Sequence, residues 1–125
     1  MTQPLDEDAV ALAQIALTAA RALNDATQPN VGYPGLTYPD DVAEVLDALA
    51  RLAGGLQSTV AHLGRFMDEE LDAGRLTGTG DSTGAAEVSA TRARLLEAHA
   101  GCGELSAQLG RASAAVTGTT SAETT

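Results

Sequence analysis

The chain has 125 residues and a formal net charge of −10 at pH 7, with seven arginines and no lysine. Proteins that bind nucleic acids or anionic membrane surfaces draw much of their affinity from basic side chains, so this balance argues against DNA, RNA and membranes as partners. A chain of this length fits one domain, which we place at residues 1–117.

The single cysteine, Cys102, permits no disulfide within the chain and fits a reducing compartment. The N-terminal residues carry neither a basic segment nor an apolar segment of the kind found in secretory signal peptides. No run of 18 apolar residues that would cross a membrane is present. These features predict a cytoplasmic protein.

A first helix is predicted over residues 6–26. Asp6, Glu7 and Asp8 stand where the positive end of a helix dipole favours carboxylates, and we interpret them as a cap. Apolar residues then recur at spacings of three and four, as in an amphipathic helix. They are Ala9, Leu12, Ile15, Ala16, Ala19 and Leu23.

Residues 27–38 contain prolines and glycines that break helices, and Pro39 then suits the first position of the next helix. Tyr33, Leu36 and Tyr38 lie in this connection. Two interpretations stay open for them: they fold back over one end of the helices, or they form a surface that contacts a partner, where tyrosine is enriched.

A central helix is predicted over residues 40–73. Three positions of each heptad form one apolar stripe, which is typical of a helix that faces a core. The stripe residues expected to be buried are Leu49, Leu52, Leu56, Leu63 and Phe66. Gly54 and Gly55 cost about 1 kcal/mol each relative to alanine, which suggests a neighbouring helix crossing closely there. A break into two helices at this point is the alternative.

The central helix ends in an acidic cluster formed by Asp68, Glu69, Glu70 and Asp72. Carboxylates at a helix C-terminus oppose the helix dipole. The cluster is therefore interpreted as a solvated end. The alternatives are that Arg65 and Arg75 offset its charge, or that an arginine-bearing partner or a divalent cation does so.

A third helix is predicted over residues 83–116, with Ser82 or Thr83 as its N-cap. The face expected to contact the central helix, its seam, is formed by the first and fourth heptad positions. The third helix also matches the central helix in length. The two helices are thus expected to form an antiparallel hairpin. The residues expected to face the central helix are Leu95, Cys102, Leu105 and Leu109. Residues 118–125 are expected to be a disordered tail.

The sequence offers little support for catalysis or for a metal site. Cys102 and His99 lie three residues apart on the predicted helix, but a thiol in an apolar seam is usually inert. His62 is not part of a metal-ligand pattern, and no phosphate-binding glycine loop is present. We therefore expect no enzyme activity, no metal and no cofactor.

Three segments carry a partial resemblance to known proteins: Tyr38-Pro39-Asp40-Asp41-Val42, Leu49 with Leu52-Ala53-Gly54-Gly55-Leu56, and Gly74-Arg75-Leu76. Together they resemble small uncharacterised helical proteins of actinobacteria, some of them encoded near plasmid or conjugative-element genes. The resemblance implies an accessory of a mobile element and no activity. The acidic helical hairpins of the WXG100 secretion family are similar in architecture only, because this chain has no tryptophan.

The sequence therefore predicts an all-α three-helix bundle, made of a long antiparallel hairpin with a shorter N-terminal helix packed on it. The expected function is helix-mediated association with a protein partner or with a second copy in a dimer. Two alternatives stay open: an acidic regulator that masks a basic surface, and a bundle that binds a small molecule or metal. The candidate partner-binding residues are Tyr33, Leu36, Tyr38, Asp68, Glu69, Glu70 and Asp72.

Overall fold

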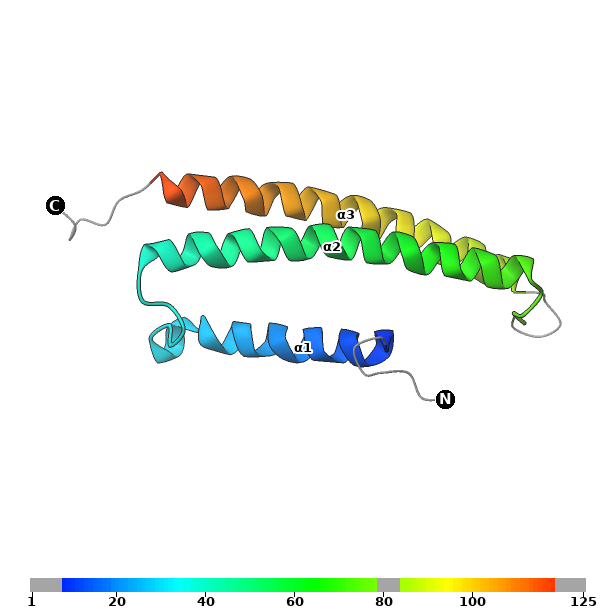
Figure 1. The fold of residues 1–125 in the computed structure, drawn as a ribbon, viewed down its shortest axis with the longest axis horizontal. Coiled ribbons are helices and arrows are strands. Elements are labelled where there is room, and N and C mark those ends of the chain that lie inside the picture. The colour runs from blue at the N-terminus through cyan, green and yellow to red at the C-terminus, as the bar shows by residue number, and fades with distance from the viewer. Residues whose placement is uncertain (1–7, 79–83, 119–125) are drawn as a thin grey trace. The chain divides into compact units, whose positions relative to one another are not determined.

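The computed structural model describes residues 8–78 and 84–118, and every regular element in this part of the chain is helical. The elements are α1 (Ala9–Ala26), the short 3-10 helix η2 (Pro29–Val31), α2 (Pro39–Asp72) and α3 (Ala85–Thr117), as Figure 1 shows. The all-α prediction is confirmed. The chain divides into two compact units, one up to Asp41 and one from Val42 onward. The prediction of a single domain over residues 1–117 stays a prediction.

Helix α1 begins after Asp8, whose carboxylate accepts hydrogen bonds from the backbone N–H groups of Val10 (3.0 Å) and Ala11 (3.4 Å). A side-chain acceptor at this position satisfies N–H groups that have no partner within the helix. The predicted cap is therefore confirmed at Asp8, while Asp6 and Glu7 lie outside the described residues. The helix ends at Ala26, as predicted.

The connection that follows α1 is held by its own hydrogen bonds. The N–H of Gly35 donates to the carbonyl of Ala26 at 2.6 Å, and a Cβ at Gly35 would lie only 2.8 Å from the Cβ of Ala26. A glycine is therefore needed for this close approach. Residues 27–38 form an ordered turn in the first unit.

Helix α2 starts with Pro39 in its first turn, as the sequence predicts. The Asp41 carboxylate accepts hydrogen bonds from the N–H groups of Thr37 (2.7 Å) and Tyr38 (3.0 Å), which completes half of a capping box. The helix then runs without interruption through Gly54 and Gly55 to Asp72. The alternative of a break at the two glycines is wrong.

Helix α3 begins at Ala85, and its N-cap is Gly84 with φ +89°. The predicted N-cap at Ser82 or Thr83 is wrong; both residues lie outside the described part of the chain, as do residues 119–125 of the predicted tail. Helices α2 and α3 have 34 and 33 residues and run side by side in opposite directions (Figure 1). The predicted antiparallel hairpin of two nearly equal helices is confirmed.

The seam between α2 and α3 is built from small residues. In the described part of the chain, the only buried apolar side chains are Ala43, Ala50, Ala53 and Val88, and Gly64 is also buried. The large side chains predicted for this seam are in different places. Leu49, Leu95, Cys102 and Leu109 are half-buried, whereas Leu52, Leu56, Leu63, Phe66 and Leu105 are exposed.

Polar groups join the two helices at intervals of one heptad. The hydroxyl of Ser113 donates to the carbonyl of Ala43 (2.8 Å), and the hydroxyl of Ser106 donates to the carbonyl of Ala50 (2.7 Å). One heptad further on, Gln57 donates to the carbonyl of His99 at 3.2 Å. A further heptad on, the Arg92 side chain occupies the space that a Cβ on Gly64 would need. We call these four pairs the polar ladder.

The polar ladder explains why the predicted seam is wrong. A serine hydroxyl reaches a backbone carbonyl on another helix only if the two helix axes are close, and leucines between the helices would hold them further apart. Alanine and glycine permit the approach, and the hydrogen bonds satisfy polar groups that the approach desolvates. The α2 helix therefore turns its small residues toward α3 and leaves Leu52, Leu56 and Leu63 on another face.

Candidate interaction surface

The face of α2 that does not pack on α3 carries an apolar stripe, which we call the outer stripe. It comprises Leu52, Leu56, Thr59, Leu63 and Phe66. The relative exposures of its large side chains are 49% for Leu52, 44% for Leu56, 50% for Leu63 and 60% for Phe66. Contiguous apolar patches of this kind on a protein surface commonly mark sites of interaction.

Thr59 does not interrupt the apolar character of the outer stripe. Its hydroxyl donates a hydrogen bond to the carbonyl of Gly55 at 3.1 Å, four residues earlier in the same helix. A threonine whose hydroxyl bonds to its own helix needs no polar partner from outside. The outer stripe is therefore continuous from Leu52 to Phe66.

Gly55 borders the outer stripe, and no contact within the described chain requires it to be glycine. A Cβ at Gly55 would meet nothing within 4 Å, whereas a Cβ at Gly54 would lie in ordinary contact with the Ser106 hydroxyl at 3.6 Å. The predicted close crossing thus falls at Gly54, where alanine also fits. The loss of helix stability at Gly55, about 1 kcal/mol relative to alanine, has no compensation within the described residues.

Arginines pair with three of the four carboxylates in the acidic cluster. Asp68 pairs with Arg92 of α3 at 3.2 Å, and Glu69 pairs with Arg65 one turn earlier at 3.4 Å. Arg75 donates two hydrogen bonds to Glu70, at 2.6 and 3.0 Å. Asp72 is the last residue of α2. The sequence left several interpretations of the acidic cluster open. The observed ion pairs agree with the one in which Arg65 and Arg75 offset the charge of the cluster.

Two carboxylates among the described residues have lowered pKa values, and both shifts predict lower stability in acid. Hydrogen bonds from the Tyr38 and Thr37 N–H groups lower the pKa of Asp41, and the hydrogen bond from Arg75 lowers that of Glu70. A group whose pKa is lowered by folding stabilises the fold above its unfolded pKa, near 3.8 for Asp41 and 4.5 for Glu70.

That contribution is lost as the pH falls through the folded pKa values. We expect the melting temperature, measured by circular dichroism, to decrease as the pH is lowered from about 4.5. Asp41→Asn should make this fall shallower than in the unsubstituted protein. An identical acid profile in the variant would show that Asp41 does not contribute.

Both tyrosines of the connection are exposed, at 50% for Tyr33 and 66% for Tyr38, while Leu36 is half-buried. Of all non-glycine residues that the structure describes, Tyr33 is the one with a positive φ, +54°. A bulky residue in this conformation is strained, and such strain is often found at functional sites. Whether the two tyrosines contact a partner or cover one end of the helices stays a prediction.

The strain at Tyr33 yields a stability prediction. Tyr33→Asn should raise the free energy of unfolding by about 0.5–1 kcal/mol, because asparagine tolerates the left-handed conformation better than tyrosine does. The measurement is urea denaturation followed by circular dichroism. The matched control is Tyr38→Asn at an exposed tyrosine without this strain, and an equal gain in both variants would contradict the explanation.

Cys102 and His99, both in the described part of the chain, are not joined by a hydrogen bond. Cys102 is a half-buried free thiol. The His99 ring lies beside Gln57, with Nδ1 3.5 Å from the Gln57 side-chain nitrogen, and this contact belongs to the polar ladder. His62 is exposed on α2. In the described ranges, no three histidine, cysteine or acidic side chains come together as a metal site would need.

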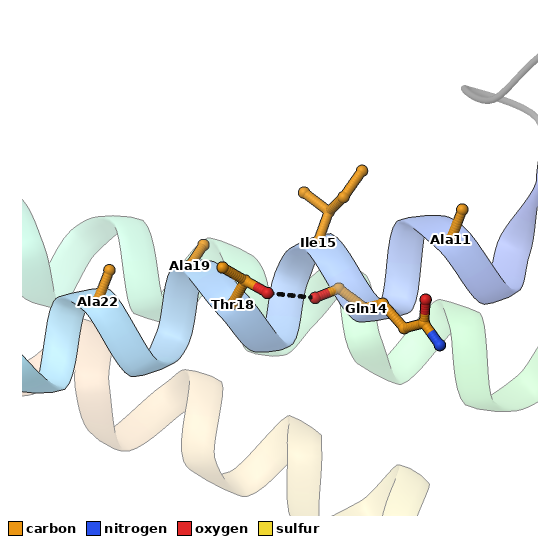
Figure 2. Close-up of a pocket in the computed structure, with 6 residues that line it drawn as sticks. All are labelled: Ala11, Gln14, Ile15, Thr18, Ala19 and Ala22. Carbon is orange, nitrogen blue, oxygen red and sulfur yellow. Dashed lines mark hydrogen bonds between the residues drawn. The ribbon is translucent and has the colours of Figure 1, made fainter.

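Two hollows on the described residues are poorly suited to small molecules. One of them, about 500 Å³, is an open depression on one helix, α1, and Figure 2 shows Ile15 projecting between Ala11 and Ala19. Its polar lining includes Thr18, whose hydroxyl is bonded to the carbonyl of Gln14 at 3.0 Å. A second hollow, beside Arg92 and His99, measures about 150 Å³. Ligand pockets are usually about 300–1,000 Å³ and enclosed on several sides.

Sequence reasoning placed the leucines of α2 on one face but assigned that face to the wrong neighbour. The polar ladder was also missed, although its signal is in the sequence. Polar residues recur every seven positions in α3, and mostly small residues recur every seven positions in α2. The α3 residues are Arg92, His99, Ser106 and Ser113, and the α2 residues are Ala43, Ala50, Gln57 and Gly64.

Comparisons with protein families, with curated proteins and with solved structures find no match to this chain. Among the described residues, no helix combines the length and the apolar character needed to cross a membrane.

Proposed function

We propose that this protein is a non-catalytic helical interaction module that associates with other helices through the outer stripe of α2. The observation that carries this proposal is the exposure of Leu52, Leu56, Leu63 and Phe66 on a helix whose seam with α3 is already complete without them. Apolar side chains at helical spacing are the usual anchors of helix-to-helix recognition.

The alternative in which the acidic cluster masks a basic partner has less support. Asp68, Glu69 and Glu70 already pair with arginines of the same chain. A basic partner would have to displace these arginines, and exposed ion pairs of this kind contribute little net affinity. Binding of a small molecule has less support as well, since the larger hollow is an open face of one helix.

The single cysteine, Cys102, which permits no disulfide within the chain, supports a cytoplasmic location. The resemblance of residues 38–42 and 49–56 to actinobacterial proteins near plasmid genes supports a role as an accessory of a mobile element. Loss of plasmid transfer or maintenance on deletion of the gene would test this role.

Analytical ultracentrifugation tests the proposed association. The average mass of the full chain should rise above that of the monomer, 12.6 kDa, as the concentration increases through the micromolar range. Circular dichroism at the same concentrations should show a melting temperature that rises with concentration, because association stabilises the folded state. A monomer that melts cooperatively at all of these concentrations would contradict the proposal.

A further inference from the structure

We draw no further inference here: the strongest candidate, the outer stripe of α2 as a docking surface, is an unpartnered apolar face, and nothing in the structure shows what covers it.

Discussion

Ala53→Leu is expected to lower the free energy of unfolding by about 1–3 kcal/mol through overpacking of the seam. Ala53 is 3% exposed, and the seam at this height also holds Gly54 and Ser106. Three added carbon atoms would push α2 away from α3 and stretch the neighbouring Ser106–Ala50 hydrogen bond, now 2.7 Å. Urea denaturation, monitored by circular dichroism, measures this change in the free energy of unfolding.

The control for Ala53→Leu is the same substitution at Ala93, an exposed residue of α3. Because Ala93 does not face the seam, Ala93→Leu should change the free energy of unfolding by no more than about 0.5 kcal/mol. Both variants add the same side chain to a helix of nearly the same length, so the difference between them reports the packing. Equal losses of stability in the two variants would show that Ala53 is not at the helix contact.

The double variant Leu63→Gln with Phe66→Gln is expected to weaken self-association about 1,000-fold, or about 4 kcal/mol. Each of these side chains is about half exposed in the single chain. Covering the exposed half of one such side chain contributes about 1 kcal/mol, and the dimer loses four of them. The measurement is the dissociation constant from analytical ultracentrifugation.

The helix content of this double variant should not change, because glutamine and leucine have similar helix propensities and neither position belongs to the seam. The control is Leu96→Gln with Leu105→Gln, at exposed leucines of α3 (64% and 52%). This control should associate with the same constant as the unsubstituted chain. An effect as large as that of the α2 variant would place the interface on α3 instead.

The helices of this protein were predictable because their ends are marked by local chemistry. Pro39 opens α2, and Thr27 follows the predicted end of α1 at Ala26. The unbroken heptad pattern across Gly54 and Gly55 correctly indicated one continuous helix. These features depend on the backbone preferences of residues that are neighbours in the sequence, so they can be recognised from the sequence alone.

The contact between α2 and α3 was not predictable from apolar periodicity alone. That criterion ranks the faces of a helix by their large apolar side chains, and so it selected Leu56 and Phe66 for the seam. The seam instead depends on how closely two backbones approach, which favours Ala50 and Gly64. The hydrogen bond from Ser106 adds stability that a hydrophobicity pattern does not record.

The candidate site was predicted in part. The acidic cluster and its partners Arg65 and Arg75 are close in sequence, so their pairing was among the expected alternatives. Arg92 is distant in sequence and pairs with Asp68 only because of the register of the hairpin. The open space at Gly55 also depends on that register, and only the structure shows that α3 does not fill it.

Intramolecular cross-linking tests most directly the claim that the small residues of α2, rather than its leucines, face α3. In a Cys102→Ser background, Ser106→Cys is combined either with Ala50→Cys or with Leu52→Cys, and each protein is oxidised at a concentration low enough to keep it monomeric. The Ser106 hydroxyl lies 2.7 Å from the Ala50 carbonyl, so the Ala50→Cys pair should form a disulfide within one chain, and the Leu52→Cys pair should not. A disulfide with Leu52→Cys and none with Ala50→Cys would place the outer stripe in the seam and contradict the account.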